Sequence, residues 1–383
     1  MTASANDLAL YVHWPFCISK CPYCDFNSHV RAQVDQEMWR KALLEDLAHE
    51  AGHLAGIRLT SIFFGGGTPS LMPPATVAAL IDAAAGHWQV APDIEITLEA
   101  NPSSVEAARF ADLASAGVNR VSLGLQALDD EVLAWLGRAH GVAEGLAALA
   151  TAQQSFERVS FDLIYARPGQ RPEAWSRELA RALSFGTEHL SLYQLTIEPG
   201  TQFATRAAKG ELATINPDEA ADLFEQTRAM AAAAGLPAYE ISNHARPGAE
   251  SRHNLAYWRY ATYAGIGPGA HGRRGHHATA RHKKPENWLA RVRNHGHGIE
   301  VDDLLSAEAR AQEALLMGLR LEEGVDLARL SQRVGLPIER LVDGDAVARL
   351  AHAGLLDLSE ERLRVTAAGM LLLDAILAQI VIA

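Results

Sequence analysis

The chain has 383 residues, of which 48% are hydrophobic and 21% are charged. This balance is typical of a soluble globular protein with a large core and excludes extensive disorder. The formal net charge of −12 argues against general nucleic-acid binding, which would need a broad basic surface.

Neither end of the chain predicts a targeting or membrane segment. The start, MTASANDLALYVHWPF, has no positive cluster before a long apolar run and no Arg-rich amphipathic stretch. The last run, MLLLDAILAQIVIA, is interrupted by Asp374 and predicts an amphipathic helix too short to span a bilayer. We therefore expect a cytoplasmic protein.

Short apolar runs alternate with Ala/Leu-rich stretches over the first half of the chain. The runs predict strands at 8–14, 61–64, 94–100, 121–126, 159–165 and 190–197. Helices are predicted between them, at 37–55, 74–86, 104–116, 129–154 and 172–184. Such repeats indicate parallel strands joined by right-handed crossovers, so we predict an α/β fold with a partial (β/α)6 TIM-like barrel over residues 1–205.

Unusual residues follow the predicted strands or lie in them, near the ends where barrel enzymes carry their chemistry. Each one taken singly has the alternative of being a turn former. They are the cysteine loop, Gly65 to Ser70, Glu99 to Pro102, Gln126, Asp162, and Tyr193 with Gln194.

A mixed α/β extension is predicted over residues 206–300, with a helix at 217–234 and then a Gly/His/Arg-rich stretch. Residues 271–297 contain seven Lys or Arg and one acidic residue, Glu286. A solvated loop is the simple explanation for the histidines of this stretch, which are His276, His277, His282, His295 and His297.

Residues 301–383 predict several helices, a short hairpin within LLDLSEERLRVT and a closing helix. This order resembles a winged helix, which often binds DNA. Residues 300–383 carry fifteen acidic and eight basic side chains, however, so a phosphate-binding face is not expected. We predict a C-terminal helical, winged-helix-like domain for packing or partner docking.

All three cysteines lie in HWPFCISKCPYCDFNSH, at spacing C-x3-C-x2-C. Cys17, Cys21 and Cys24 have no other thiol to pair with, and thiolates suit iron–sulfur clusters or zinc. Structural zinc would need a fourth ligand, which His13 or His29 could supply. A four-iron cluster held by three cysteines keeps one iron open. Three ordinary thiols are the remaining alternative.

The stretch YVHWPFCISKCPYCDF resembles the signature of radical S-adenosylmethionine (SAM) enzymes, and GGGTPS resembles the glycine motif that follows their second strand. The resemblance implies a radical SAM barrel with an oxygen-sensitive [4Fe-4S] cluster on Cys17, Cys21 and Cys24. It also implies that SAM chelates the open iron.

The likeness narrows to the subgroup that contains oxygen-independent coproporphyrinogen III oxidase (dehydrogenase), HemN, and a haem chaperone, HemW. It implies a SAM pocket made of residues that could each be structural caps instead. These residues are Tyr11, Gly66, Gly67, Glu99, Gln126, Arg138 and Asp162.

Two features separate the members of this subgroup. The dehydrogenase pattern has a further cysteine two positions after the third ligand, where this chain has Phe26. The chaperone pattern has H-N-x-x-Y-W, which matches HNLAYW, His253 to Trp258. The resemblance therefore favours the chaperone and implies haem as a ligand. Without it, a histidine beside aromatic residues is more often an ordinary core or surface residue.

His253 is the first choice for the iron ligand, with His244 or a later histidine as alternatives. Tyr257 and Trp258 are expected to pack on the porphyrin. The propionates are expected to pair with basic residues of the 271–297 segment, namely Arg273, Arg274 or Arg281.

One departure from the subgroup pattern follows the fifth predicted strand. The subgroup reads DLIYGLPGQ, whereas this chain reads DLIYARPGQ, with Ala166 and Arg167 in place of Gly and Leu. We expect Arg167 to add charge near the barrel mouth, beside SAM or a propionate.

The resemblance implies a function in porphyrin metabolism: binding of cluster, SAM and haem, and delivery of haem to acceptor haemoproteins, including membrane haemoproteins. An electron donor such as a flavodoxin or ferredoxin is implied as a partner. Two alternatives remain. One is a coproporphyrinogen III dehydrogenase that uses the 5′-deoxyadenosyl radical, and the other is a zinc-stabilised binding protein.

Overall fold

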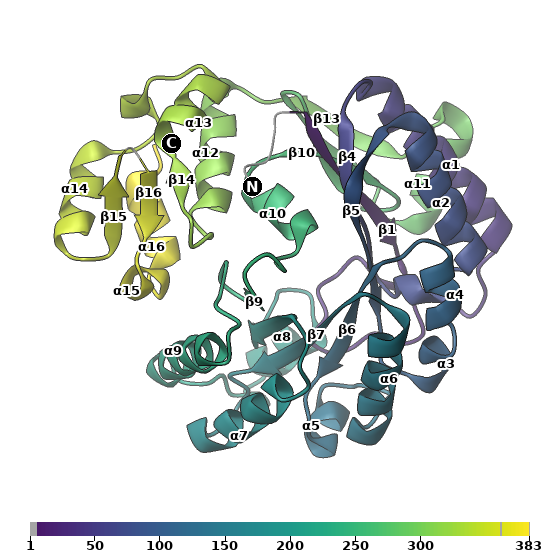
Figure 1. The fold of residues 1–383 in the computed structure, drawn as a ribbon, viewed down its shortest axis with the longest axis horizontal. Helices are drawn as coiled ribbons and strands as arrows, with labels where there is room; N and C mark the ends of the chain where they lie inside the picture. The colour runs from purple at the N-terminus through teal and green to yellow at the C-terminus, as the bar shows by residue number, and fades with distance from the viewer. Residues whose placement is uncertain (1–5, 361, 383) are drawn as a thin grey trace.

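The computed structural model describes residues 6–360 and 362–382 and shows a curved, mostly parallel sheet with helices packed on its outer face (Figure 1). The predicted α/β fold with a partial barrel is confirmed. The six predicted strands are β1 (Asp7–Trp14), β4 (Arg58–Gly66), β5 (Gln89–Ala100), β6 (Arg120–Gln126), β7 (Arg158–Tyr165) and β8 (His189–Gln194). The outer helices are α1 (Gln36–His53), α2 (Pro74–His87), α3 (Ser104–Ala107), α4 (Phe110–Ser115), α5 (Asp130–Trp135), α6 (Val142–Ser155) and α7 (Pro172–Leu183).

The barrel strands are buried on both faces, which explains their nearly continuous apolar sequence. In β1, Leu8, Leu10 and Val12 are fully buried and so is Ala9 on the other face. Capping side chains define the helix starts. For example, Asp35 accepts a hydrogen bond from the backbone N–H of Met38 at the start of α1.

Two of the predicted helices are broken in the structure. The stretch at 104–116 forms α3 and α4, and the stretch at 129–154 forms α5 and α6. Between α5 and α6, Gly137 has a φ of 70°, and a Cβ there would lie 2.6 Å from Pro22 Cδ. The break therefore lets the cysteine loop come close to the turn that carries Arg138.

The segment after residue 205 adds strands to both edges of the sheet. The strand order is β13-β12-β11-β10-β1-β4-β5-β6-β7-β8-β9. A seventh parallel strand, β10 (Thr262–Ile266), pairs with β1 and was not predicted. The antiparallel strands are β11 (His271–Arg274), β12 (His277–Arg281) and β13 (Ile299–Leu304) beyond β10, and β9 (Asn243–Ala245) beside β8.

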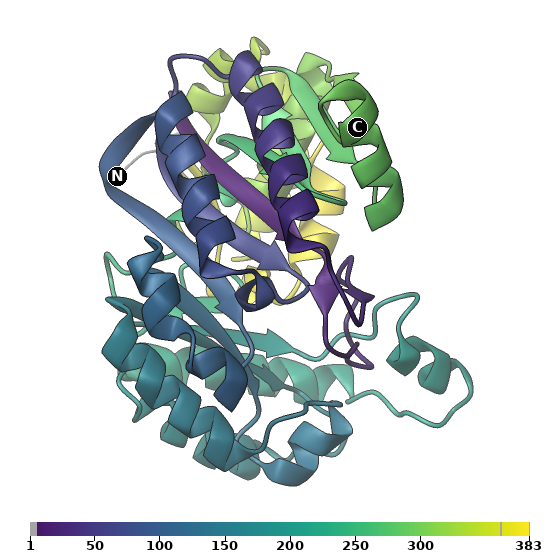
Figure 2. The same ribbon diagram turned by 90° about the vertical axis from the view of Figure 1, so that its right-hand side faces the viewer.

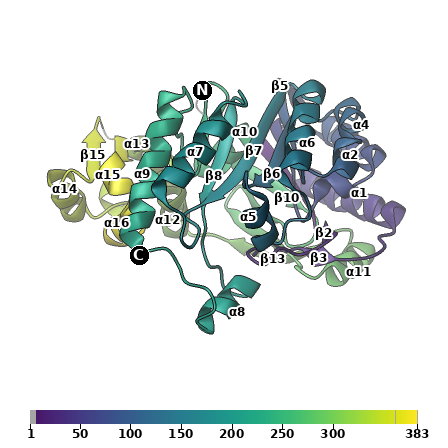
Figure 3. The same cartoon turned by 90° about the horizontal axis from the view of Figure 1, so that it is seen from below.

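The helices of this segment lie on different sides of the sheet. They are α8 (Gln202–Ala208), α9 (Pro217–Ala233), α10 (Arg252–Trp258) and α11 (Pro285–His295). Figure 1 shows α10 inside the curve of the sheet, and Figure 2 shows α11 beside α1. Figure 3 shows α8 extending from the body. At its start, Phe203 N–H donates to Pro22 O in the cysteine loop, at 2.9 Å.

A buried ion-pair network joins α1 to the extension. Arg281 is fully buried and donates to Asp46 at 2.7 Å and to Glu50 at 2.9 Å. The same Asp46 carboxylate accepts from Trp288 Nε1 and from the backbone N–H groups of Gly267 and Gly298. Asp46 therefore fixes four separate points of the extension to one helix.

The other arginines predicted to bind propionates are also occupied. Arg274 is buried and paired with Asp302. Arg273 pairs with Glu313 and lies 3.7 Å from the centre of the Tyr260 ring. The prediction that Arg273, Arg274 or Arg281 meets a propionate is therefore wrong for this structure, because the three guanidinium groups hold the extension together.

The predicted surface position of the other histidines of this segment agrees with the structure. His276 and His295 are exposed, and His277, His282 and His297 are partly exposed. His277 and His282 lie beside Asp302 and Glu300, at 2.8 and 3.3 Å.

The C-terminal part has its own apolar core and a small antiparallel sheet, in the order β14-β16-β15. The predicted hairpin is β15 (Leu356–Ser359) with β16 (Arg362–Val365), and β14 (Val325–Asp326) pairs with β16. The helices are α12 (Ala307–Gly318), α13 (Leu327–Val334), α14 (Gly344–His352), α15 (Ala367–Met370) and α16 (Leu373–Ile380). Across the described residues, none of the helices has the length and apolarity to cross a membrane.

Candidate functional site

The cysteine loop leaves the C-terminal end of β1 and is closed by two short parallel strands, β2 (Phe16–Cys17) and β3 (His29–Val30). The three cysteines are half-buried. Thr68 Oγ1 and Arg138 Nη1 each donate to a sulfur, of Cys17 and Cys21 respectively, at 3.5 Å. Hydrogen-bond donors of this kind stabilise a thiolate, which is the form that binds iron.

The two histidines that could complete a zinc site are engaged in other contacts. His13 accepts from Tyr11 OH at Nδ1 and donates from Nε2 to Asn27 O, at 3.0 and 2.9 Å. His29 Nε2 lies 3.2 Å from Asn27 Oδ1. Within the described residues, no three His, Cys, Asp or Glu side chains are placed to hold one metal ion. A four-iron cluster has a different requirement, because its cysteines bind separate irons.

A cavity of about 560 Å³ opens beside the cysteine loop. Three residues of the predicted SAM pocket line its inner wall: Tyr11 from β1, Gly66 from β4 and Glu99 from β5. The rest of the lining combines apolar, aromatic, basic, acidic and imidazole side chains. It includes Lys20, Asp25, Phe26, His29, Tyr257, His271 and Lys283.

The glycines at the end of β4, Gly66 and Gly67, are needed for close contacts within the protein. Gly66 has a φ of 112°, and a Cβ there would lie 2.6 Å from the ring of His13. A Cβ on Gly67 would lie 2.7 Å from Phe16 O. Any side chain at these positions would push the glycine turn away from the cysteine loop.

Two carboxyl groups of the predicted SAM pocket have raised pKa values. Burial raises the pKa of Glu99 to about 8, and the charge of Asp162 adds to this shift, while the Gly66 N–H that donates to Glu99 opposes it. Burial also raises the pKa of Asp162 to about 6, against hydrogen bonds from Ser191 and Ser122. At pH 7 Glu99 is therefore mostly protonated and Asp162 mostly ionised.

Glu99→Gln is expected to remove a pH dependence of stability. The pKa of Glu99 is about 8 in the folded chain and 4.5 when unperturbed, so at intermediate pH the folded chain binds the extra proton. Wild-type stability therefore falls as the pH rises from 4.5 to 8. Urea unfolding followed by circular dichroism should show the variant about 4 kcal/mol more stable at pH 8 and equal near pH 4.5.

The exposed carboxylate of Glu286 provides the matched control for this variant. Glu286→Gln should leave the slope of stability between pH 5 and 8 unchanged. A difference between Glu99→Gln and wild type that is constant over this range would contradict the assignment of the slope to Glu99.

The remaining predicted SAM residues lie around the cavity and do not line it. Arg138 donates to Cys21 Sγ, Asn101 Oδ1 and Gly124 O. Gln126 has a φ of 70°, and Asp162 lies on β7. Arg138 therefore links the cysteine loop to the ends of β5 and β6.

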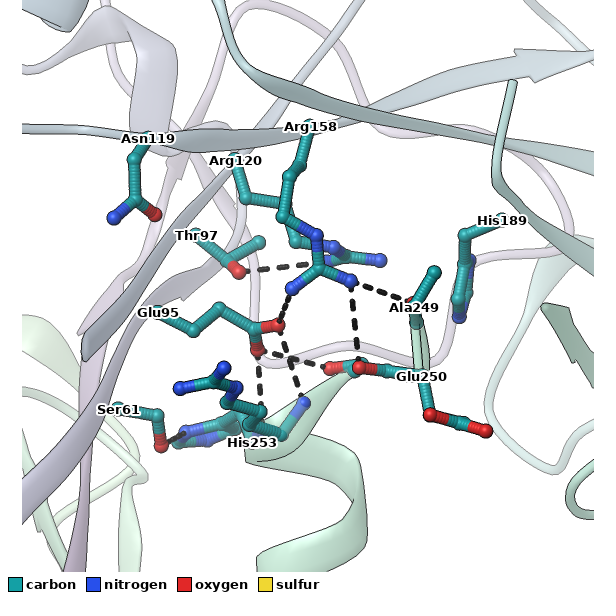
Figure 4. Close-up of polar contacts among 12 residues, drawn as sticks. Ser61, Glu95, Thr97, Asn119, Arg120, Arg158, His189, Ala249, Glu250 and His253 are labelled. Atoms are coloured by element: carbon teal, nitrogen blue, oxygen red, sulfur yellow. Dashed lines mark hydrogen bonds and ion pairs between the residues drawn. The ribbon is translucent and has the colours of Figure 1, made fainter. Parts of the chain in front are cut away.

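His253 is held in the interior by a buried carboxylate on β5. Figure 4 shows Glu95 between Arg158 and the first turn of α10. Glu95 accepts from Arg158 at 2.7 Å and from the backbone N–H groups of Arg252 and His253 at 3.2 and 3.1 Å. A carboxylate at this helix end satisfies N–H groups that have no partner within the helix.

The imidazole of His253 is enclosed. It is 2% exposed, and its Nδ1 is hydrogen-bonded to Ser61 Oγ at 3.0 Å. Its ring centre lies 4.9 Å from those of Phe63 and Tyr257. Burial lowers the pKa of His253 to about 3, so the ring is neutral. Tyr257 lines the large cavity, but His253 does not.

Trp258 points to another part of the molecule. It lines a small cavity between α10 and the C-terminal domain and lies 6.0 Å from the Arg320 guanidinium. The prediction that Tyr257 and Trp258 both pack on one porphyrin is wrong for this structure, because they line different cavities.

Arg167 also differs from expectation, and Ala166 before it has an unusual backbone conformation. Ala166 has a φ of 55°, the left-handed region that glycine adopts most easily. Arg167 is buried and paired with Glu178, which also accepts from the backbone N–H of Leu128. Arg167 therefore ties the loop after β7 to the loop after β6 and adds no charge to the large cavity.

Sequence reasoning missed several residues of the site. Asn27 donates to the backbone oxygens of Pro268 and Lys283, both at 2.9 Å, and so fastens the cysteine loop to the extension. His271 and Lys283 reach the cavity through β11 and the loop after β12. No local motif marks these residues, because their position depends on the unpredicted pairing of β10 with β1.

Comparison with known families gives two matches along the chain. The model of the radical SAM superfamily matches residues 11–180, and that of the HemN C-terminal domain matches residues 305–372. The structure of coproporphyrinogen III oxidase (HemN) from Escherichia coli aligns with a TM-score of 0.82 and 25% identity, over 97% of this chain and 89% of that one. The fold and the cysteine loop thus define a member of the radical SAM superfamily.

Curated relatives narrow the family further. The heme chaperone HemW of Mycobacterium tuberculosis is 37% identical, over 96% of this chain and 93% of that protein. The mitochondrial radical S-adenosyl methionine domain-containing protein 1 of Bos taurus is 42% identical, over 96% of this chain and 86% of that protein. The chain belongs to the HemN/HemW family.

Proposed function

We propose that this chain is a haem chaperone that holds a [4Fe-4S] cluster, binds SAM and haem, and delivers haem to acceptor haemoproteins. The observation that carries the proposal is Phe26, which lines the cavity with 57% of its surface exposed. It stands where the dehydrogenase pattern has a cysteine. The identity to a relative named heme chaperone HemW supports the same conclusion.

The cluster would be held by Cys17, Cys21 and Cys24, with Thr68 and Arg138 donating to sulfur. A bound and reduced cluster supplies an electron for the cleavage of SAM. An external donor such as a flavodoxin or ferredoxin would deliver that electron.

SAM would occupy the inner wall of the cavity, at Tyr11, Gly66 and Glu99. Gly67 would keep the glycine turn close to the cysteine loop. Gln126 at the end of β6, Arg138 after α5 and Asp162 on β7 would support this wall from the neighbouring strands.

The prediction that His253 binds haem iron remains untested. In this structure its Nε2 has no hydrogen-bond partner and is buried beneath Tyr257 and Tyr11. Binding of iron at this nitrogen would require α10 to move away from β4.

Coproporphyrinogen III dehydrogenase is the second candidate function. The TM-score of 0.82 with the Escherichia coli enzyme favours it, because the two chains share their fold over nearly their whole length. Fold alone does not define activity, and Phe26 replaces a residue of the dehydrogenase pattern.

The test uses protein reconstituted anaerobically with iron and sulfide. We expect haem to give a Soret band and to pass to an apo-haemoprotein, and SAM to change the electron paramagnetic resonance spectrum of the reduced cluster. With SAM, dithionite and coproporphyrinogen III we expect no protoporphyrinogen by chromatography. Turnover at an enzymatic rate would favour the second candidate and contradict the chaperone proposal.

The acceptor haemoproteins would include membrane haemoproteins met from the cytoplasmic side. The cytoplasmic location is a proposal for this chain, and one relative is named a mitochondrial protein.

A further inference from the structure

The side chains at the mouth of the large cavity are suited to bind a flat ligand that is both apolar and negatively charged. Apolar side chains of the cysteine loop and β3 are turned to solvent: Ile18, Phe26 and Val30 are 69, 57 and 48% exposed. Ile18 and Val30 belong to the same loop region and do not line the cavity. Exposed apolar side chains that cluster on a surface favour a ligand or partner that covers them. Phe26 is itself part of the cavity wall.

The charges at this mouth are basic, although the chain as a whole carries −12. Lys20 and Lys283 line the cavity and are exposed, and neither is paired with a carboxylate among the described residues. Asp25 is the exposed acidic residue of the wall, and Glu99 is mostly protonated at pH 7. Two free ammonium groups therefore complement a ligand with two carboxylates.

Three histidines line the same cavity, and they differ in what their rings contact. His13 and His29 are hydrogen-bonded within the cysteine loop. His271, the first residue of β11, is exposed, and no hydrogen bond to its ring occurs among residues 6–360 and 362–382. Partial burial and the charges of Lys283 and Arg281 lower the pKa of His271, so its ring is neutral at pH 7. A neutral, free imidazole is the form that binds iron.

We infer that haem docks at this mouth with His271 as a ligand of the iron, Lys20 and Lys283 at the propionates, and Phe26 against the porphyrin. The inference rests on the proposed function and assigns the haem site within it. The inner wall at Tyr11, Gly66 and Glu99 is left for SAM. His253 lies on α10 and is enclosed by contacts with β4 and β5. In this assignment it holds α10 in place and does not bind the iron.

Haem titration of the anaerobically reconstituted protein, followed by the Soret band, tests this inference. His271→Ala should shift the band and weaken haem binding at least tenfold, and free imidazole should restore the band. Lys20→Ala with Lys283→Ala should weaken binding severalfold without a shift. His276→Ala is the matched control, because His276 is exposed in the turn between β11 and β12 and does not line the cavity.

His253→Ala separates the two possible ligands, and circular dichroism shows whether each variant is folded. If folded His253→Ala loses the wild-type band while His271→Ala keeps it, the inference is overturned and the ligand is His253. If His271→Ala binds haem with unchanged affinity and spectrum, the inference also fails, although the chaperone proposal stands. If wild-type protein binds no haem, the chaperone proposal itself fails.

Discussion

Replacing Cys17 with alanine is expected to lower bound iron from about four atoms per chain to background. In the proposed site three thiolates would hold the cluster, and the loop has no spare cysteine, because the chain contains only three. Iron and sulfide analysis after anaerobic reconstitution, with the visible absorption of the cluster as the second readout, would measure the loss. The same result is expected for Cys21→Ala and Cys24→Ala.

His29→Ala is the control for these variants, since His29 is half-buried in the same loop and is the candidate fourth ligand of a zinc site. It should keep its iron, and circular dichroism should show all four variants folded. Stoichiometric zinc without iron in the wild type, lost in His29→Ala, would establish the zinc alternative instead.

Asp46→Ala is expected to reduce the free energy of unfolding by about 3–5 kcal/mol. The change leaves Arg281 with only Glu50 in a fully buried position and removes the acceptor of Trp288 and of two backbone N–H groups. An uncompensated buried charge is far more costly than a lost surface contact. Urea unfolding followed by far-ultraviolet circular dichroism would measure the change.

The exposed pair of Arg31 with Glu286 offers the matched comparison. Its side chains are 41 and 65% exposed, so Glu286→Ala should cost less than about 1 kcal/mol. Equal losses for the two variants would show that Asp46 contributes no more than a surface carboxylate. If Asp46→Ala is too unstable to purify, adding Arg281→Met and Glu50→Gln to Asp46→Ala should recover part of the stability, because the three buried charges of the cluster are then removed together.

Most of the fold could be predicted from local sequence patterns. Each barrel strand reads as a short apolar run because helices cover one face and the barrel interior the other. The predicted ranges 8–14 and 159–165 differ from β1 and β7 by one residue at their starts. The break between α5 and α6 was not predicted, because it depends on the approach of Pro22 to Gly137.

The predicted site residues also fall into two groups, those placed by local strand patterns and those placed by long-range packing. Tyr11, Gly66 and Glu99 follow or lie in predicted strands, and they do share one cavity. His253 was chosen from a motif, and a motif contains no information about burial. Its enclosure comes from Glu95 and Ser61, which lie more than 150 residues away in the sequence.

Composition could not reveal that the basic residues of the extension form ion pairs with acidic residues far away in the sequence. The basic segment at 271–297 indicated a ligand-binding surface because its acidic partners lie elsewhere. Asp46 and Glu50 are on α1, and Glu313 is on α12. Charge counted along a segment therefore says little about the charge that the folded surface presents.

The position of β1 between β4 and β10 also determines when the sheet around β1 can be completed during synthesis on the ribosome. β1 ends at Trp14, and β10 begins about 250 residues later, at Thr262. At roughly 5–20 residues per second, β1 waits about 12–50 s for its second neighbour. Throughout that interval Asn27 lacks Pro268 and Lys283, its later partners. The cysteine loop therefore emerges early, without the hydrogen bonds that later fasten it to the extension.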